Sequence, residues 1–374
     1  MPHTLRRMSR YIHLLKDWPT FKWEDEKIIS PLSTVRHKQG RLLGKLEGLG
    51  FRMREEATLE TLTQDVMKSS EIEGEKLPAD QVRSSIARRL GIEIAGEVTA
   101  NRDVEGVVEM MLDATQRYDL MLTTERLFGW HASLFPTGRS GMYKIQVGGW
   151  RDDAKGPMQV VSGAFGRERI HYEAPEAGRL NIEMNTFLEW FNKATAMDPV
   201  LKAAIAHLWF VTIHPFEDGN GRIARAIADM QLARADASRQ RFYSMSAQIQ
   251  RDRNIYYDIL EKTQKGNLDI TNWLLWFIEC LDRAITLSDE NLSGVTQKAK
   301  FWESHQGVAL NERQQKMLNR LMDGFDGKLT SSKWAKIAKC SPDTALRDIQ
   351  DLIEKEILEK EEGGGRSTSY RIRG

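Results

Sequence analysis

The stretch HPFEDGNGRIAR, His214 to Arg225, is a polar loop set between two apolar helical patterns. Residues 198–213, DPVLKAAIAHLWFVTI, precede it, and helical hydrophobic spacing resumes in residues 223–230. Its two glycines let the backbone turn tightly and approach a ligand. Because the second helix begins here, its unpaired N–H groups and the positive end of its dipole face the loop. We therefore expect an anion-binding site between two buried helices.

The charged side chains of this loop suit a polyphosphate and its metal ion. Arg222 and Arg225 are three residues apart, so they lie on one helix face and point toward the same anion. Two guanidinium groups beside a helix N-terminus favour bound phosphates. Asp218 offers the hard oxygen ligand that Mg²⁺ prefers, and His214 is the natural proton acceptor near neutral pH. Each feature alone is commonly structural, but together they indicate a catalytic site.

The loop resembles the Fic family motif HxFx(D/E)GNGRxxR at every defined position. The resemblance covers about residues 97–292. Residues 141–175, which are rich in glycine, tryptophan and β-branched residues, resemble the hairpin flap on which this family docks its targets. The resemblance implies a mainly α-helical fold, with a Fic helical core and a small β-hairpin flap. It also implies a nucleotidyltransferase that moves AMP from ATP to a Tyr, Thr or Ser hydroxyl of a protein.

The resemblance further implies a role for each residue of the loop. His214 deprotonates the target hydroxyl, Asp218 holds Mg²⁺ between the α- and β-phosphates, and Phe216 is a core anchor. Asn220 and the Gly219–Gly221 backbone bind the α-phosphate. Arg222 binds the β-phosphate, and Arg225 binds the γ-phosphate. Pyrophosphate then leaves, so the chemistry rests on positioning and charge neutralisation.

A later segment, NIYYDILEKTQKGN at residues 254–267, resembles the segment that lines the adenine pocket in this family. Tyr257 and Gln264 are the nucleotide-binding candidates there, and packing roles would explain both equally well. His207 lies two turns before His214 within the apolar helix. A hydrogen-bonded core histidine is the simpler interpretation of His207 than a second base.

A second short pattern predicts an inhibitory helix near the N-terminus. The apolar stripe of residues 59–66 continues at helical spacing to Ser69 and Glu73, so we expect Glu73 to face inward. A buried carboxylate needs a partner, and Gly74 supplies the helix stop. Ser69, Glu73 and Gly74 match the Fic inhibitory pattern (S/T)xxxE(G/N). The resemblance implies that Glu73 pairs with Arg225 and keeps the γ-phosphate from binding.

The C-terminal residues 312–374 have the helix, helix, helix, strand, turn, strand order of a winged helix-turn-helix domain. The second helix of the helix-turn-helix begins at Ser341 and Pro342 and offers Arg347 and Gln350 to a partner. The carboxylates of that helix would repel phosphates: Asp343, Asp348, Asp351 and Glu354. The strands add arginines: Arg366, Arg371 and Arg373. DNA binding therefore stands beside protein docking and homodimerisation as an alternative.

The composition is that of a globular protein, with 41% hydrophobic and 29% charged residues among 374. The net charge of +1 excludes a global field that attracts nucleic acid or membrane. Cys280 and Cys340 match no metal-binding spacing, which favours free thiols in a reducing compartment. The first residues carry too much charge for a signal peptide, and no apolar stretch could span a bilayer. We expect a cytoplasmic protein without membrane contact.

Changes in hydrophobic pattern predict four parts of the chain. Residues 1–96 form an N-terminal helical region that includes the inhibitory helix, and residues 97–296 form the Fic catalytic domain. Residues 297–311 lose clear periodicity and are the predicted linker, and residues 312–374 form the winged helix.

The leading hypothesis is a self-inhibited protein adenylyltransferase with ATP as substrate, Mg²⁺ as its metal and an unknown target protein. Self-modification and a homodimer are further partner hypotheses. One alternative is a de-AMPylase in which Glu73 orients a water molecule in the same site. Another is a DNA-binding regulator whose Fic core acts as a sensor. Because the motif fixes the diphosphate and not the base, transfer of UMP, phosphate or phosphocholine is a further alternative.

Overall fold

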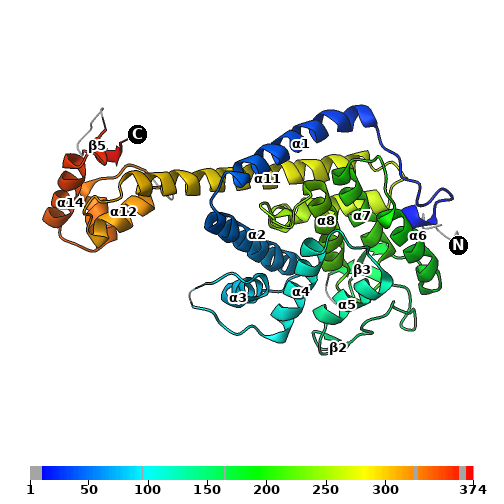
Figure 1. Cartoon of the computed structure of the whole chain (residues 1–374). Coiled ribbons are helices and arrows are strands. Elements are labelled where there is room, and N and C mark those ends of the chain that lie inside the picture. Colours follow the sequence, from blue (N-terminus) through cyan, green and yellow to red (C-terminus); the bar gives the residue numbers. More distant parts are fainter. Residues whose placement is uncertain (1–10, 95, 164–165, 323–326, 362–367, 374) are drawn as a thin grey trace. The chain divides into compact units, whose positions relative to one another are not determined.

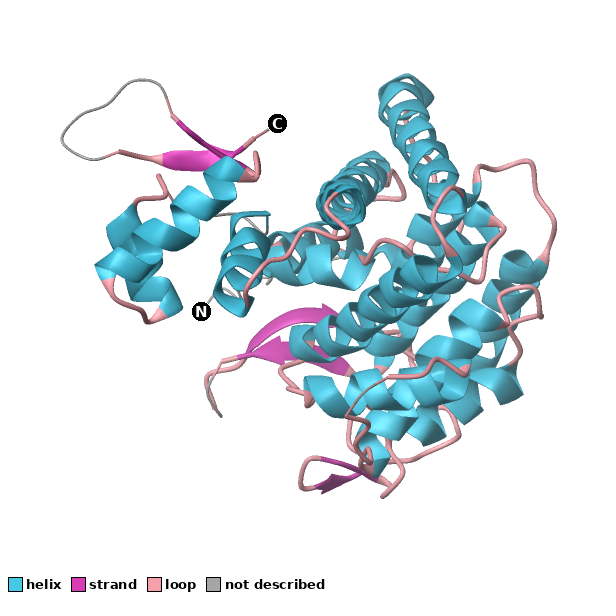
Figure 2. Cartoon of the chain, turned by 60° about the vertical axis from the view of Figure 1, so that its left-hand side comes forward, coloured by secondary structure: helices cyan, strands magenta, loops and turns pink. Residues whose placement is uncertain are grey.

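The computed structural model describes residues 11–94, 96–163, 166–322, 327–361 and 368–373. The chain divides into two compact units, Met1–Ser288 and Asp289–Gly374. Helices dominate the described residues of both units, and the strands there form short two-stranded hairpins (Figure 2). The prediction of a mainly α-helical fold is confirmed.

Helices make up most of the first unit, which is shown in Figure 1. In chain order they are η1 (Ile12–Leu14), α1 (Asp25–Glu47), α2 (Phe51–Ile72), α3 (Ala79–Leu90), α4 (Arg102–Gln116), α5 (Thr124–Leu134), η2 (Ala177–Arg179), α6 (Leu180–Asn192), α7 (Pro199–Ile213), α8 (Asn220–Asp236), α9 (Met245–Arg251), α10 (Arg253–Gln264) and α11 (Thr271–Ser304), which runs through the division. Two antiparallel hairpins interrupt them, β1 (Arg139–Ser140) with β2 (Tyr143–Lys144) and β3 (Gln159–Ser162) with β4 (Arg169–Glu173).

Helices α7 and α8, drawn in green in Figure 1, form the central pair of this unit. Asp198 caps α7 by accepting a hydrogen bond from the Val200 N–H at 2.8 Å, and Pro199 occupies the first turn. Every residue from Val200 to Ile213 is buried. A helix that is apolar on all sides must be covered on all sides, and α6 and α8 pack against it. The loop between α7 and α8 is therefore held from both ends by the core.

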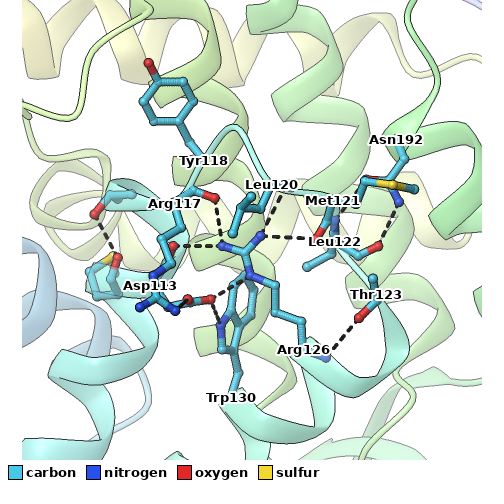
Figure 3. Close-up of polar contacts among 12 residues, drawn as sticks. Asp113, Arg117, Tyr118, Leu120, Met121, Leu122, Thr123, Arg126, Trp130 and Asn192 are labelled. Atoms are coloured by element: carbon cyan, nitrogen blue, oxygen red, sulfur yellow. Dashed lines mark hydrogen bonds and ion pairs between the residues drawn. The ribbon is translucent and has the colours of Figure 1, made fainter.

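Arg126 on α5 fixes the connection between α4 and α5 (Figure 3). Its guanidinium donates to four backbone carbonyl oxygens at the end of α4 and in the following turn, those of Asp113, Arg117, Leu120 and Met121. It also donates to the Asp113 carboxylate at 2.6 Å, which accepts a second bond from Trp130 Nε1 at 2.7 Å. This network sets the position of α5, whose C-terminal end lies against the α7–α8 loop.

The second unit contains α12 (Glu312–Met322), α13 (Ser331–Ala338), α14 (Pro342–Glu354), β5 (Leu358–Lys360) and β6 (Tyr370–Ile372). This is the predicted order of elements, and β5 pairs antiparallel with β6. Its core includes Trp334, and Ala345, Ile349 and Leu352 on α14. Arg347 and Gln350 are exposed on α14, and Arg366 lies outside the described residues. The winged-helix assignment and its DNA, docking and dimer alternatives stay predictions.

The start of the predicted linker differs from the structure. Residues 297–304 belong to α11, which continues to Ser304. Phe301 and Trp302 pack against the core of the second unit, and this contact favours continuing the helix past the point where its apolar periodicity weakens.

Two expectations from composition concern the cysteines and the membrane. Cys280 is buried and Cys340 is partly exposed, and both are free thiols. Among the helices that the structure describes, none combines the length and the apolar character needed to cross a bilayer.

Candidate active site

His214 ends α7 in a left-handed backbone conformation, with φ 52° and ψ 58°. For a residue with a Cβ atom this conformation costs on the order of 1–2 kcal/mol, so surrounding contacts must hold it. The His214 N–H donates to the Phe210 carbonyl oxygen at 3.0 Å. The turn stops the helix at the first residue of the motif and begins the loop.

Arg151 holds this turn from the flap side and is a functional candidate that sequence reasoning missed. Its guanidinium side chain is fully buried, and its Nε donates to the His214 carbonyl oxygen at 2.8 Å. Its backbone N–H donates to the Pro215 carbonyl oxygen at 2.9 Å. Asp153 and the Pro175 carbonyl oxygen accept from the remaining guanidinium nitrogens. Arg151 therefore ties the chain before the flap strand β3 to the backbone of the candidate base.

The hydrogen bonds of His214 assign its tautomer. Its Nδ1 lies 3.3 Å from the Val211 carbonyl oxygen, which can only accept, so Nδ1 carries the proton and Nε2 keeps its lone pair. Burial lowers the pKa of His214 to about 4 and Arg151 adds to this, against opposing effects of the Val211 bond, Asp218 and Glu73. The imidazole is therefore neutral at pH 7 and able to accept a proton.

The N-terminus of α8 faces the loop as predicted. The first helical hydrogen bond runs from the Ile223 N–H to the Gly219 carbonyl oxygen at 3.0 Å, so the N–H groups of residues 220–222 precede it. Gly219 has φ 79°, and a Cβ atom there would come within 2.9 Å of the Phe135 ring. Only glycine meets both demands, which explains its place before the helix.

The Asn220 side chain closes the loop on itself. Its Oδ1 accepts from the Phe216 N–H at 3.0 Å, and its Nδ2 donates to the Phe216 carbonyl oxygen at 2.8 Å. Phe216 is fully buried and stacks on His131, with ring centroids 4.2 Å apart. Because both polar side-chain atoms of Asn220 are engaged, its predicted contact with a phosphate rests on its backbone N–H.

Both motif arginines are buried, with 3% of the Arg222 side chain and 2% of the Arg225 side chain exposed. Each retains a buried donor without a hydrogen-bond partner among the described residues, Nε of Arg222 and Nη1 of Arg225. Leaving such donors unsatisfied costs free energy, so both favour binding an additional acceptor. The Arg222 guanidinium also lies over the Phe135 ring, 5.1 Å from its centroid.

The end of α2 engages Arg225. Ser69 accepts twice from this guanidinium, through Oγ and through its carbonyl oxygen, each at 2.9 Å. Glu73 follows as the C-cap of α2, and its Oε1 lies 2.7 Å from Arg225 Nη2. Gly74 has φ 87° and ends the helix there. The structure thus brings together the three residues of the predicted inhibitory pattern and Arg225.

Two details of this contact were not apparent from the sequence. The Glu73 side chain is 30% exposed, because it faces a pocket rather than the core. A Cβ atom on Gly221 would lie 2.2 Å from Glu73 Oε1, so a side chain at this position would displace the carboxylate from its present place. In addition, Glu75 Oε2 lies 2.7 Å from Nη1 of Arg222, so the second motif arginine also has a carboxylate partner.

A pocket of about 450 Å³ adjoins the loop and the flap. Glu73, His214 and Gly221 line it on one side. Tyr257 and Gln264, the predicted adenine-site residues, line it as well. The Tyr257 hydroxyl lies 3.4 Å from the Ile72 carbonyl oxygen, and Gln264 Nε2 lies 3.3 Å from Thr212 Oγ1, while His207 is buried against the Tyr256 hydroxyl at 2.9 Å.

The two acidic residues of the loop face different surroundings. Asp218 accepts from the Gly219 N–H at 2.6 Å and from the Ser140 hydroxyl of the β1–β2 hairpin. Glu217 lies 3.8 Å from Lys155 and near the Gln146 N–H. No cluster of three metal-ligating side chains occurs in the described part of the chain. A single carboxylate such as Asp218 fits Mg²⁺ that takes its other ligands from phosphates and water.

The β3–β4 hairpin forms the wall of the pocket opposite the loop. In this two-stranded sheet, Ser162 lies opposite Arg169 near the tip. His171 links the hairpin to α10, with Nδ1 at 2.6 Å from Glu261 Oε2 and Nε2 at 2.5 Å from Ser162 Oγ. Arg169 donates to the same carboxylate at 2.9 Å. The hairpin is therefore anchored beside the pocket, and an outer strand edge remains for an extended peptide.

Two family models match parts of this chain. Residues 121–232 match the Fic/DOC family, a segment that spans the flap, α7 and most of α8. Residues 11–92 match a domain of unknown function, DUF4172, a segment that includes α2 with Ser69 and also Glu73 and Gly74 just after it.

Curated proteins similar to this chain include two named protein adenylyltransferase Fic. The protein from Aedes aegypti is 28% identical over 242 residues, and the one from Culex quinquefasciatus is 28% identical over 237 residues. Each alignment covers 62% of this chain and 42% of the relative. The chain thus spans about two fifths of the length of these relatives.

Solved structures share the fold. A Fic family protein from Desulfovibrio desulfuricans superimposes with a TM-score of 0.50 at 20% identity, covering 92% of this chain and 96% of that one. A Fic domain-containing signaling protein from Bacteroides thetaiotaomicron also gives 0.50, at 22% identity, covering 69% of this chain and 95% of its own.

Proposed function

Because residues 121–232 match the Fic/DOC family, we propose that this chain is a protein adenylyltransferase that moves AMP from ATP to a Tyr, Thr or Ser hydroxyl of a target protein. One observation carries the proposal. The N-terminus of α8, two buried arginines with free donors and a neutral histidine converge on a single loop. This combination suits transfer from a polyphosphate to a hydroxyl.

In the proposed complex the triphosphate lies along the start of α8. The backbone N–H groups around Gly219–Gly221 bind the α-phosphate, Arg222 binds the β-phosphate and Arg225 binds the γ-phosphate. The free donors of the two arginines supply charge-assisted hydrogen bonds to these groups. Tyr257 and Gln264 contact the adenine in the adjoining pocket.

His214 acts on the target and not on the nucleotide. Its Nε2 takes the proton of the target hydroxyl while that oxygen bonds to the α-phosphorus. The bond from the α-phosphorus to the bridging oxygen breaks, and pyrophosphate leaves. Arg151 keeps the His214 backbone in place during this step. The target segment adds to the outer edge of the β3–β4 hairpin, which brings its hydroxyl to the pocket.

Asp218 is the residue that would hold Mg²⁺ beside the bound phosphates. The ion supplies neutralisation of the charge that develops on the phosphates. The Ser140 hydroxyl and the Gly219 N–H orient the Asp218 carboxylate toward the loop. Glu217 faces the flap side instead and takes no part.

Self-inhibition follows from the contact between α2 and α8. Glu73 accepts from Nη2 of Arg225 and places a negative charge beside the guanidinium that the γ-phosphate needs, so the triphosphate cannot settle with its α-phosphate in line with the target hydroxyl. Ser69 accepts from Nε and Nη2 of the same guanidinium and fixes its orientation. Movement of Glu73 away from Arg225 would release the activity.

The test uses ATP labelled at the α-phosphate and the Glu73→Gly chain, incubated with cell lysate. We expect label on protein, a mass increase of one AMP, and no transfer from UTP or from CDP-choline. Adding His214→Ala should reduce the transfer by about 10²–10⁴-fold and leave ATP affinity nearly unchanged. Undiminished transfer by this double variant would exclude His214 as the base.

A second candidate activity is removal of AMP from modified proteins. The partly exposed Glu73 carboxylate and His214 line the same pocket, so Glu73 could orient a water molecule for attack on a bound phosphodiester. AMP release from a previously modified protein, present in wild type and lost in Glu73→Gly, would favour this activity over transfer.

A further inference from the structure

Glu75 makes a second carboxylate contact with the motif, separate from the inhibitory pattern. Its Oε2 lies 2.7 Å from Nη1 of Arg222. The Glu75 backbone is fixed independently of this contact, because its N–H donates to the Ser70 carbonyl oxygen at 3.0 Å beyond the helix stop at Gly74. The carboxylate is thus presented to Arg222 by the way the chain leaves α2.

The two carboxylates line different openings. Glu73 lines the pocket that holds His214 and Tyr257. Glu75 lines a second pocket, of about 440 Å³, whose other charged side chains are the cations Arg222, Lys76 and Arg139 and the carboxylate of Asp103. A pocket with these cations and the proposed β-phosphate ligand suits the pyrophosphate end of the substrate.

We infer that Glu75 is a specificity-determining residue that competes with the β-phosphate for Arg222, as Glu73 competes with the γ-phosphate for Arg225. This inference rests on the proposed function, because it uses the assignment of one phosphate to each arginine. The inference assigns the two carboxylates different effects on nucleotide affinity. Glu75 weakens every nucleotide with a β-phosphate, whereas Glu73 weakens only those with a γ-phosphate.

The exposure of the two carboxylates sets how each can be displaced. The Glu75 side chain is 49% exposed, so it can turn into solvent when a phosphate arrives, without movement of α2. Glu73 is 30% exposed and lies against Gly221, where a Cβ atom would collide with it. The Glu75 contact is therefore the weaker of the two, in keeping with solvent screening of a partly exposed ion pair.

The test compares ADP and ATP affinities, measured by calorimetry with Mg²⁺, for the full-length wild type and for matched amide substitutions. We expect Glu75→Gln to tighten both ADP and ATP by roughly 3- to 10-fold. Glu73→Gln should tighten ATP and leave ADP within about 2-fold, since ADP does not reach Arg225. Glu71→Gln is the control, because Glu71 lies near the end of α2 but pairs with Lys68 at 2.8 Å.

Each outcome is decisive for this inference. If Glu75→Gln changes ADP affinity no more than Glu71→Gln does, the competition at Arg222 is refuted while the transferase proposal stands. The same holds if Glu75→Gln shifts only the melting temperature, which is the result of a merely structural contact. If no variant binds either nucleotide and none transfers AMP, the proposed function fails and the inference fails with it.

Discussion

Helix α2 is tied to the rest of the first unit by two arginine–carboxylate clusters that differ in their access to solvent. Within the helix, Asp65 Oδ2 lies 4.0 Å from Nη2 of Arg241, which also pairs with Asp229 Oδ1 at 2.7 Å. These three side chains are at most 1% exposed. At the helix end, Glu73 pairs with Arg225 at 2.7 Å and keeps 30% of its side chain exposed at a pocket.

The difference separates a structural contact from one that a ligand can replace. No phosphate can reach the closed cluster of Asp65, Arg241 and Asp229, so its charges depend on one another. The open pair borders a pocket, where phosphate or water can take the place of the carboxylate. The helix can therefore stay anchored at Asp65 while its end releases Arg225.

The largest expected effect comes from breaking the closed cluster. Arg241→Met leaves two buried carboxylates without their cation, which should lower the free energy of unfolding by about 3–5 kcal/mol. Urea denaturation followed by circular dichroism measures this loss. Arg239→Met, at an exposed position two residues away, is the control and should change stability little. A loss below about 1 kcal/mol in Arg241→Met would contradict the structural role.

The next test concerns the two carboxylates of the loop, Asp218 and Glu217. In the described structure Asp218 has hydrogen-bond partners but no arginine partner. In the Glu73→Gly background, Asp218→Ala should reduce AMP transfer by about 10²–10³-fold and abolish the Mg²⁺ dependence of nucleotide binding. Glu217→Ala is the matched control and should retain transfer. The metal assignment is wrong if the two variants exchange these behaviours.

Opening the accessible pair should raise activity without unfolding the chain. Glu73→Gly removes a charge-assisted hydrogen bond to Arg225, so we expect transfer to rise about 10- to 100-fold. Its melting curve should match that of wild type, because solvent and phosphate reach the freed guanidinium. Adding Arg225→Ala should abolish the activation, since the γ-phosphate then has no partner. A variant that melts like wild type and transfers no more AMP would remove Glu73 from the inhibitory mechanism.

The smallest effect concerns the pH dependence of stability. Burial lowers the pKa of four histidines from 6.5, to about 4 for His13, His131 and His214 and about 3 for His207. The unfolded chain binds these protons below pH 6.5 and the folded chain does not, so stability should fall as the pH drops from 6.5 toward 4. Burial and the neighbouring Asp229 raise the pKa of Asp65 to about 7, against the effect of Arg241.

Asp65 therefore opposes the histidines, because its folded form gains a proton as the pH falls below 7 while its unfolded form does not. Asp65→Asn should steepen the loss of stability on acidification, by at most about 1.4 kcal/mol per pH unit. Denaturation midpoints at pH 7.5, 6.5 and 5.5 measure this slope. Asp258→Asn, at an exposed position, is the control. An unchanged slope in Asp65→Asn would show that the closed cluster holds no titrating carboxyl.

The loop from His214 to Arg225 could be predicted because its residues are contiguous, and the helix periods on both sides fix which of them share a face. Glu73 could be predicted for the same reason, since its helix stripe and the following glycine are local. The partner Arg225 came from family resemblance, and the structure places the two side chains 2.7 Å apart.

The residues that sequence reasoning missed depend on contacts between distant segments. Arg151 supports His214 across 63 positions, and Arg241 meets Asp65 from a loop far along the chain. From the sequence alone, a single arginine or aspartate is predicted to be exposed to solvent, and only the packed structure shows that its charge is buried. Glu75 lies just past the helix stop, where periodicity gives no face on which to place it.

In the proposed mechanism, the inhibited and the active states both depend on the lack of a side chain at Gly221. The absence of a side chain lets Glu73 reach Arg225, since an added Cβ atom would lie 2.2 Å from the carboxylate. The same bare backbone lets a phosphate approach the start of α8 in the proposed complex. A substitution of Gly221 that changes inhibition would therefore also change binding of the substrate. In the proposed mechanism, changes at Ser69 and Glu73 could instead adjust the threshold for activation from the α2 side.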